Sequence, residues 1–408
     1  MSFVLAAASL PKAPALTSGM YICFLELITK GSHLSSHVTT LWHKTGIIKK
    51  EPCSMKSWPQ NLKLHCKVKD FGPRCEERKR KYVMNAASEK SNEYEIQDQD
   101  KKNSLGSLLN ALHVFFKFIR PIATLSLLLG ASLTTLTAVE KFSDLSPAYF
   151  TGLLQVLVVA SCMQIFMAGL NQLYDVEIDK INKPYLPLIS GELSFKNGVI
   201  IVASSFIVGH LFPLIIGSWP LFWSFVFSSS LAIAYCADLP LLRWKRYSAL
   251  TALNYVTDLA GVKPLGFFLH MQTYVFKRPV TFSRPLLFCM AMSSVFAIII
   301  AIFKDIPDME GDEKFGIKSL SSHLGQKRVF WICVSLLQTA YGGAIFMGAL
   351  SPFIWVKIVM GLGHGILASL VWHYAKSVDL KSNPAIQSFY VFIWKLFTIE
   401  YFLIPLFR

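Results

Sequence analysis

Charged residues are scarce in this chain. Of its 408 residues only 16% are Asp, Glu, Lys or Arg, 53% are hydrophobic, and the mean hydropathy is +0.45. This composition excludes an ordinary soluble globular domain. Residues 197–237 contain none of the four charged residue types, and Gly217-Ser-Trp-Pro220 divides them into two stretches of roughly 20 residues, each long enough to cross a bilayer. We therefore predict a polytopic membrane protein.

Cysteine and histidine patterns that would mark a disulfide framework or a zinc site are also absent. The chain has eight cysteines, but half of them lie in its first 75 residues and the others are scattered singly, with no C-x-x-C spacing. The histidines do not cluster in sequence, which argues against haem and zinc. The glycines of residues 361–365 follow no predicted strand, so they are not a nucleotide-binding fingerprint.

Long apolar runs are what the chain has instead. They occupy about 118–139, 149–174, the two halves of 197–237, a weaker stretch at 248–270, 285–303, 329–350, 353–375 and 386–407. Only a helix or a closed barrel satisfies its backbone groups in lipid. The fold class is therefore predicted to be all-α, with about nine transmembrane helices. In the last run, Lys395 and Glu400 are expected to form a structural pair.

The first hundred residues differ from the rest in composition. Up to residue 50 there is a single acid, Glu26, with several lysines, many Ser and Thr and no membrane-length run, which is typical of an organellar transit peptide. Residues 76–103 are charged and poor in apolar side chains, as in a disordered junction. A disordered cytosolic tail is the alternative for the leader. The predicted division is a transit peptide and leader at 1–85, a charged linker at 86–110 and a membrane domain at 111–408.

Two acidic segments interrupt the apolar runs. Asn171, Asp175 and Asp179 are spaced four residues apart after the second run. Asp308 and Asp312 have the same spacing after the sixth. Each set therefore lies on one face of a helix. Carboxylates grouped at the ends of membrane helices repel one another unless they bind cations, so these segments are the strongest indication of function.

Both acidic segments are expected on the same side of the membrane. Each follows an even-numbered span, so both emerge on the side of the N-terminus and can meet across the bundle. The loops on that side also carry Arg243, Lys245, Arg246, Lys314, Lys318, Lys327, Arg328, Lys376 and Lys381. By the positive-inside tendency, that side is cytoplasmic or its organellar equivalent. The net charge of +15 can then be explained without a nucleic-acid partner. The basic residues either face anionic lipid or bind phosphate.

The chemistry of the acidic segments indicates Mg²⁺ and a diphosphate. Mg²⁺ takes one or two carboxylates and completes its shell with water and phosphate oxygens. Basic residues accompany the segments, namely Arg120, Lys180, Lys183, Arg243, Lys245, Arg246, Lys304 and Lys318. Metal ions and cations make diphosphate a good leaving group, and its departure from an allylic carbon leaves an isoprenyl cation that aromatic faces stabilise.

These segments resemble the motifs of a known family. The segment 171–194 resembles the NQxxDxxxD motif of the UbiA-type membrane prenyltransferases, and 304–312 resembles the KDxxDxxGD motif of their plant homogentisate and flavonoid branch. The similarity covers essentially all of 105–408. It implies nine helices around a central cavity in a plastid membrane. Mg²⁺ and an isoprenyl diphosphate would lie under the acidic loops, with an aromatic acceptor below them.

By position, the resemblance assigns roles to individual residues. The expected catalytic carboxylates are Asp175, Asp179, Asp308 and Asp312. The expected metal ligands are Asn171, Asp175, Asp179, Asp305, Asp308 and Asp312, of which Asp305 is an extra acid of the plant branch. The residues expected to hold diphosphate are Asn171, Lys183, Lys318, Lys245 and Arg246, together with Arg120, which lies on the same side at the start of the first apolar run.

The fifth span departs from the family pattern. The tocopherol-pathway enzymes of the branch are described with an arginine and a glutamine there, whereas this chain has Asn254 and Asp258, four residues apart, followed by Lys263 and Pro264. A carboxylate inside a membrane helix marks a functional site by default. Two interpretations stay open. Asp258 orients an acceptor phenol, or it pairs with Lys263 in a Pro-kinked, poorly formed helix.

The expected reaction is Mg²⁺-dependent C-prenylation of an aromatic ring. The allylic diphosphate ionises, the carbon ortho to a phenol attacks the cation, and a proton is lost. The altered fifth span suggests drift from homogentisate chemistry, which favours a flavonoid or isoflavonoid acceptor and dimethylallyl diphosphate. Homogentisate phytyl or geranylgeranyl transfer and coumarin or stilbene prenylation are alternatives. A cation-coupled membrane carrier is the non-enzyme alternative, but it would place its carboxylates near the middle of the bilayer.

Overall fold

The structure, a computed structural model, describes residues 106–317 and 319–407. The predicted leader at 1–85, most of the predicted linker and Lys318 lie outside the described residues. The chain divides into two units after Ala111, and the unit that begins at Leu112 holds the elements below. Within the described residues all regular structure is helical, which confirms the all-α prediction.

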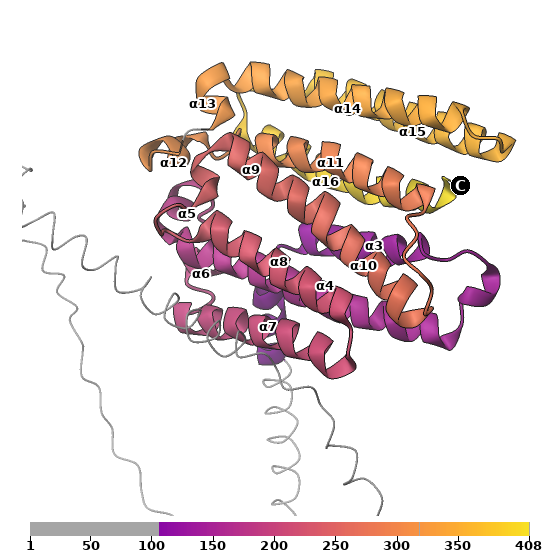
Figure 1. Ribbon diagram of the computed structural model, residues 1–408. Coiled ribbons are helices and arrows are strands. Elements are labelled where there is room, and N and C mark those ends of the chain that lie inside the picture. Colours follow the sequence, from indigo (N-terminus) through magenta and orange to yellow (C-terminus); the bar gives the residue numbers. More distant parts are fainter. Residues whose placement is uncertain (1–105, 318, 408) are drawn as a thin grey trace, which may run out of the picture. The chain divides into compact units, whose positions relative to one another are not determined.

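The helices follow one another through short connections (Figure 1). In chain order they are α3 (Pro121–Leu136), α4 (Pro147–Tyr174), α5 (Val176–Asn182), α6 (Pro187–Ser190), α7 (Phe195–Ile216), α8 (Trp219–Cys236), α9 (Ser248–Tyr255), the π-helix η3 (Val256–Val262), α10 (Lys263–Leu269), the π-helix η4 (His270–Val275), α11 (Arg284–Phe303), α12 (Met309–Lys314), α13 (Leu320–Leu324), α14 (Gln326–Ala349), α15 (Ile354–Ser377) and α16 (Asn383–Leu403). Three 3₁₀ turns lie between or after these helices, η1 (Phe142–Asp144), η2 (Trp244–Arg246) and η5 (Ile404–Leu406), and a helix at Gly106–Phe118 precedes α3.

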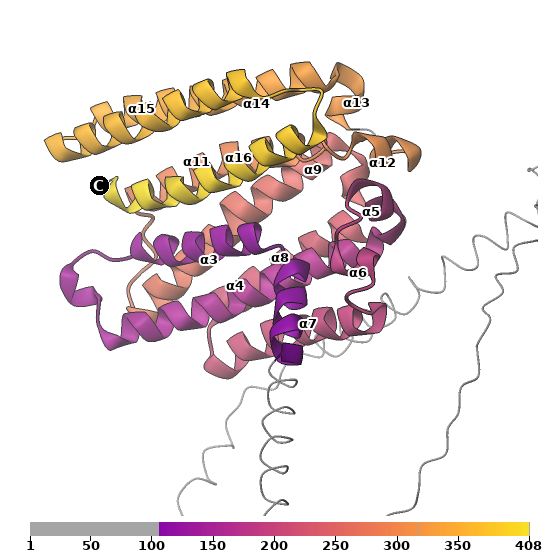
Figure 2. The same cartoon turned by 180° about the vertical axis from the view of Figure 1, so that it is seen from behind.

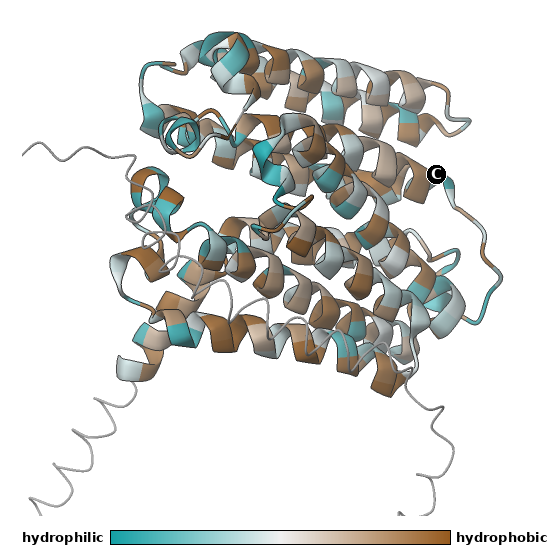
Figure 3. Cartoon of the chain, turned by 60° about the vertical axis from the view of Figure 1, so that its left-hand side comes forward, coloured by the Kyte–Doolittle hydropathy of each residue, from teal (hydrophilic) through white to brown (hydrophobic). Residues whose placement is uncertain are grey.

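Seven of the described helices are each long and apolar enough to cross a membrane, namely α4, α7, α8, α11, α14, α15 and α16. An eighth crossing results if the helix Gly106–Phe118 and α3, which are bent by 75° at their junction, form one span. The weak run predicted at 248–270 is a continuous helical rod made of α9, η3, α10 and η4, none of which is long enough alone. The predicted count of about nine corresponds to the seven helices, the bent pair and this rod. Figure 3 shows hydrophobic residues along the long helices and hydrophilic stretches mainly at their ends.

The rod continues through Pro264 without a break. This proline, which has no N–H to donate, lies in the first turn of α10, directly after the π-helix η3. The carbonyl of Val262 accepts a hydrogen bond from Ser224 Oγ on α8 at 3.1 Å. Local π-helical winding is one way in which a membrane helix accommodates a proline. The expected poorly formed helix is therefore a regular but partly π-helical one.

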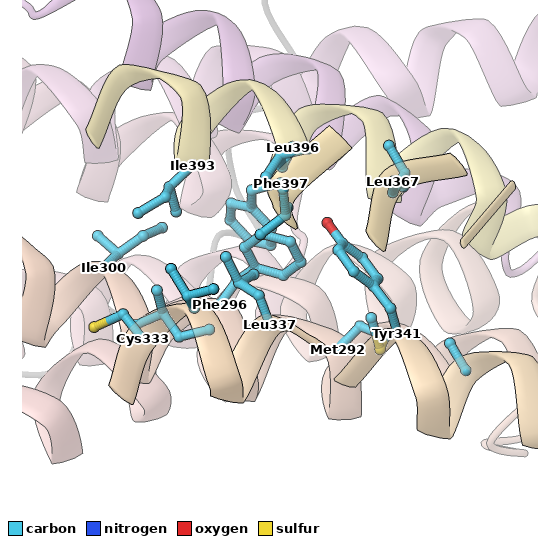
Figure 4. Close-up of a cluster of buried hydrophobic side chains, with 14 of the residues drawn as sticks. Met292, Phe296, Ile300, Cys333, Leu337, Tyr341, Leu367, Ile393, Leu396 and Phe397 are labelled. Carbon is cyan, nitrogen blue, oxygen red and sulfur yellow. The ribbon is translucent and has the colours of Figure 1, made fainter. Parts of the chain in front are cut away.

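An extensive apolar core lies between α11, α14, α15 and α16 (Figure 4). Within it, the rings of Phe296 and Phe397 stack with centroids 5.0 Å apart, and Tyr341 is fully buried. Apolar side chains gain little by leaving lipid for a protein interior, so close packing of this kind is what holds membrane helices together. In Figure 1, α14 and α15 form an antiparallel pair on the outside of this core.

Glu400 on α16 does not pair with Lys395. Its Oε1 lies 3.0 Å from Nε2 of His364 on α15, both side chains are fully buried, and Lys395 is exposed. Residues five apart on an α-helix are rotated by about 140° from each other, so the two side chains leave α16 on different faces. The expected Lys395–Glu400 pair is therefore wrong.

The helices that follow the two acidic segments lie at one end of the bundle. Figures 1 and 2 both place α5, α6, α12 and α13 there, and α5 contacts α12. Because α5 follows α4 directly and α12 follows α11, the two acidic segments meet at this end.

Candidate active site

A cavity of about 390 Å³ reaches both acidic segments and continues along the rod and α16. The charged and Asn side chains that line it around the acidic segments are called here the polar end: Lys117, Arg120, Asn171, Asp175, Asp179, Asn182, Lys183, Lys245, Lys304, Asp308 and Asp312. The rod contributes a second group, called here the inner wall, which consists of Asn254, Tyr255, Asp258 and Lys263. One cavity therefore contains most of the predicted site residues.

A chain of hydrogen bonds holds the first acidic segment. Nη2 of Arg120, which has a left-handed backbone conformation just before α3, donates to Asn171 Oδ1 at 2.8 Å. Nδ2 of Asn171 donates in turn to Asp175 Oδ2 at 2.8 Å. The other oxygen of Asp175 pairs with Lys245 and lies 3.8 Å from Arg243 Nη2. Arg120 just before α3, Asn171 on α4 and basic residues of the loop after α8 therefore fix one carboxylate.

Lys183 joins the two acidic segments. Its Nζ lies 2.5 Å from Asp308 Oδ2 and 3.5 Å from Asp179 Oδ1. Burial opposes the charge of this ammonium group, but the fields of Asp308 and Asp179 outweigh it and raise the pKa of Lys183 above its usual value. The lysine therefore stays charged and relieves part of the repulsion that the sequence led us to expect.

Asn182 forms a second link, which the sequence did not reveal. Its Oδ1 accepts a hydrogen bond from the Gly311 backbone N–H at 2.9 Å, and its Nδ2 lies 3.5 Å from Asp312 Oδ1. A Cβ atom at position 311 would clash with the amide of Asn182, so a larger residue there would displace this side chain. Asn182 carries no charge and lies outside the i, i+4 spacing, so no feature of the sequence pointed to it.

The carboxylates retain oxygens that fit a Mg²⁺ ion. Asp179 Oδ2 and Asp308 Oδ1 are buried, and neither has a hydrogen-bond partner among the described residues. In the part of the chain that the structure covers, no three His, Cys, Asp or Glu side chains form a metal cage by themselves. Mg²⁺ needs only one or two carboxylates when phosphate oxygens and water complete its shell. The donor set therefore fits Mg²⁺ together with a phosphate-bearing ligand.

Burial governs the protonation of this end. It raises the pKa of Asp312 to about 7, against the lowering effect of Lys304 and with the support of Asp308 and Asp305. Burial likewise raises the pKa values of Asp179 and Asp305. Ionised carboxylates here are thus costly without a further cation.

Two of the predicted site residues that the structure describes, Asp305 and Arg246, do not line the cavity. Asp305 is buried, and its Oδ1 lies 2.5 Å from the ammonium group of Lys304, which does line it. Arg246 has a side chain that is 47% exposed and pairs with Asp238 at 3.1 Å. Lys318 lies outside the described residues. Asp305 therefore contacts a lysine that lines the cavity, whereas Arg246 does not contact the cavity.

Asp258 and Lys263 form a buried ion pair on the inner wall. The pair with Lys263 that the sequence offered as one interpretation is therefore confirmed, and both residues line the cavity. Asn254, one turn earlier, is anchored through Nδ2 to the carbonyl of Leu231 on α8 at 2.9 Å.

Aromatic side chains line the same cavity. The rings of Tyr235 and Tyr255 pack edge to face with centroids 5.9 Å apart, and those of Tyr390 and Trp394 on α16 lie 6.4 Å apart. The ammonium group of Lys304 lies 5.9 Å from the centroid of Tyr235. Such rings attract cations. Aromatic residues are frequent throughout this chain, so the sequence could not tell which of them line a cavity.

Known proteins resemble this chain over most of its length. The UbiA prenyltransferase family matches residues 125–396. The solved structure of a UbiA homolog from Archaeoglobus fulgidus bound to GPP and Mg²⁺ has a TM-score of 0.49 at 16% identity, and the likeness covers 72% of this chain and 99% of that one. A naringenin 8-dimethylallyltransferase of Sophora flavescens, described as chloroplastic, is 58% identical over 408 residues, which is 100% of both chains. The chloroplastic homogentisate phytyltransferase 1 of Arabidopsis thaliana is 52% identical over 75% of this chain and 78% of its own.

Proposed function

The chain belongs to the UbiA prenyltransferase family and is a membrane prenyltransferase, and we propose that it transfers a dimethylallyl group from its diphosphate to a ring carbon of a flavonoid. The similarity over the full length to a naringenin 8-dimethylallyltransferase carries this choice of substrates. Transfer of a phytyl or geranylgeranyl group to homogentisate is the second candidate, favoured by the similarity to a homogentisate phytyltransferase over three quarters of the chain. Membership of a transferase family removes the carrier alternative.

The proposed location is a plastid membrane, with the acidic segments on the side of the N-terminus. The names of both plant relatives support the plastid, and the seven long apolar helices support a multi-pass protein. The composition of residues 1–85 supports a transit peptide at the N-terminus.

The polar end is proposed to bind the diphosphate. Asp175, Asp179, Asp308 and Asp312 would hold Mg²⁺, which neutralises the charge that develops on a departing diphosphate. Lys183 and Lys245 contact carboxylates of this end, and Arg120 donates to the Asn171 side chain. All three cations would donate to phosphate oxygens when the donor binds. Lys304 adds a fourth cation to the lining.

The reaction breaks the bond between the allylic carbon and the diphosphate oxygen, and the diphosphate keeps the electron pair. A ring carbon ortho to a phenolic hydroxyl supplies the pair for the new C–C bond, and its proton is then lost to restore aromaticity. Tyr235, Tyr255, Tyr390 and Trp394 surround the space with ring faces and edges, which favour a cation and exclude water.

A matrix of donors and acceptors tests this function. The full chain, expressed in membranes without prenyltransferase activity of their own, is supplied with a flavanone, an isoflavone, homogentisate, a coumarin and a stilbene. Each acceptor is paired with dimethylallyl, geranylgeranyl and phytyl diphosphate, with Mg²⁺ or with excess chelator. We expect product from dimethylallyl diphosphate and a flavonoid, and none with chelator. Product from homogentisate and phytyl diphosphate alone would refute the flavonoid assignment.

A further inference from the structure

Asp258 and Lys263 meet only because the rod is π-helical between them. On an α-helix, side chains five residues apart are rotated by about 140° and cannot pair, as Lys395 and Glu400 demonstrate on α16. In η3 the Lys263 backbone N–H donates to the Asp258 carbonyl, a bond that spans five residues, so the two positions lie one above the other. The local winding therefore brings a lysine to a carboxylate on the cavity side of the rod.

The ion pair leaves one carboxylate oxygen of Asp258 available. Lys263 contacts Oδ2, whereas Oδ1 is buried and has no hydrogen-bond partner among the described residues. Asp258 is 93% buried, and a buried carboxylate oxygen without a donor is costly. Because Asp258 lines the cavity, a ligand there can supply the missing donor.

The position of the pair separates it from the diphosphate. The loop before the rod reaches the polar end, where Lys245 pairs with Asp175. At a rise of about 1.5 Å per residue, Asp258 lies about 15 Å along the rod from Ser248. Asp258 and Lys263 therefore face a part of the cavity beyond the acidic segments, where the acceptor of the proposed reaction would lie.

Stability alone does not explain this pair. A buried ion pair is weak evidence for stability, because well-packed apolar residues of similar size are often as stable or more stable. A purely structural pair also has no need to line a cavity or to leave one oxygen without a donor. A single carboxylate with its own lysine is a poor site for a metal ion or for a diphosphate, but it is a good acceptor of a hydrogen bond from a hydroxyl group.

We propose that Asp258 anchors the acceptor: its Oδ1 accepts a hydrogen bond from a phenolic hydroxyl, while Lys263 keeps the carboxylate ionised and in place. This inference rests on the proposed function, in which the acceptor is a phenol. It makes Asp258 and Lys263 determinants of acceptor specificity, with no role in binding the isoprenyl diphosphate.

The test is a cycle that combines one change in the enzyme with one change in the acceptor. The wild-type chain and the variant Asp258→Asn are assayed with a flavanone and with each of its mono-O-methyl ethers. For the wild type we expect one ether to lose about 10- to 100-fold in kcat/KM, the usual size of a hydrogen bond to a charged group. With the parent phenol, Asp258→Asn should lower kcat/KM by a similar factor. In this variant, methylation of the same hydroxyl should lower kcat/KM further by less than about threefold. The KM for dimethylallyl diphosphate should stay unchanged.

Two further variants keep this test decisive. Asp258→Leu combined with Lys263→Met removes both charges together and should fold even if the single variant, which strands a lysine, does not. Asp144→Asn is the matched control, because Asp144 is also buried and pairs with Arg278 at 2.5 Å, but outside the cavity. The Asp144→Asn variant should show the same loss in kcat/KM on methylation of the acceptor as the wild type. Binding of dimethylallyl diphosphate with Mg²⁺ shows that each variant is folded.

The outcomes separate the two proposals. Suppose that the wild type prenylates the phenol and that mutation and methylation together lower kcat/KM by the product of their separate factors. The two changes then act independently, so the proposed hydrogen bond from Asp258 is refuted and the proposed function stands. If the wild type prenylates no phenolic acceptor, the proposed function fails and takes the anchor with it.

Discussion

The polar end and the inner wall of the cavity hold carboxylates in different ways. At the polar end, aspartates from two segments far apart in sequence share cations and amides that come from α3, α4, α5 and the loops after α8 and α11. On the inner wall, one aspartate has one lysine from the same rod. A shared network can exchange partners and take up a metal ion, whereas an isolated pair offers a single oxygen. The contrast suggests one end built for a highly charged donor and another built for a single hydroxyl.

The largest effect is expected from removing a carboxylate at the polar end. Asp175→Ala and Asp308→Ala should each lower kcat/KM for prenyl transfer by at least about 100-fold, because charge on the departing diphosphate is then poorly neutralised. Product formation at saturating Mg²⁺ measures this loss. The control Asp144→Asn should stay within about threefold. Undiminished transfer in either alanine variant contradicts a metal-bound diphosphate.

The link between the two segments should be nearly as sensitive. Gly311→Ala forces Asn182 away and shifts the segments apart, and a misplacement of about 1 Å at a reacting group can cost about 100-fold. We expect a loss of about 10- to 100-fold in kcat. Gly343→Ala on α14, where an added Cβ meets no atom within 4 Å, is the control and should behave as wild type. Equal activities for the two variants would show that the contact has no functional role.

Protonation of Asp312 should change the Mg²⁺ concentration that the enzyme requires. The pKa of Asp312 is raised to about 7, so below pH 7 a proton competes with the metal ion, and above it the carboxylate is free to bind. The Mg²⁺ concentration for half-maximal activity should rise by up to about tenfold between pH 7 and pH 6 and change little between pH 7.5 and 8.5. Excess Mg²⁺ should restore activity at pH 6. A Mg²⁺ requirement that is the same at pH 6 and pH 8 contradicts this role of Asp312.

The smallest effect distinguishes two neighbouring basic residues. Lys245→Ala should raise the KM for dimethylallyl diphosphate about tenfold, because this lysine is buried against Asp175 in the cavity lining. Arg246→Ala should change it by less than about twofold, as expected for an exposed ion pair outside the cavity. Steady-state kinetics with varied donor measures both. A larger effect of Arg246→Ala would restore the role that the sequence suggested for it.

The sequence predicted the fold class, the seven long apolar helices and the meeting of the two acidic segments, because apolar length and the parity of spans depend on residue type and order alone. It did not predict Asn182, whose role depends on a contact between α5 and α12 across 129 positions of the chain. It also could not separate Lys245 from Arg246, which are adjacent in sequence but differ in burial. The sequence also did not predict which helix is π-helical. Two pairs are each spaced by five residues, Asp258–Lys263 and Lys395–Glu400, but only the first forms an ion pair, because only the first lies on a π-helix.

The division of the cavity into a donor end and an acceptor end is tested most directly by donor binding in the absence of acceptor. Purified full-length wild type, Asp308→Ala and Asp258→Asn are titrated with dimethylallyl diphosphate at saturating Mg²⁺. The division predicts that Asp258→Asn keeps the wild-type Kd within about twofold, whereas Asp308→Ala weakens binding by at least about tenfold, the loss expected for a charge-assisted contact. Equal weakening in the two variants would contradict it.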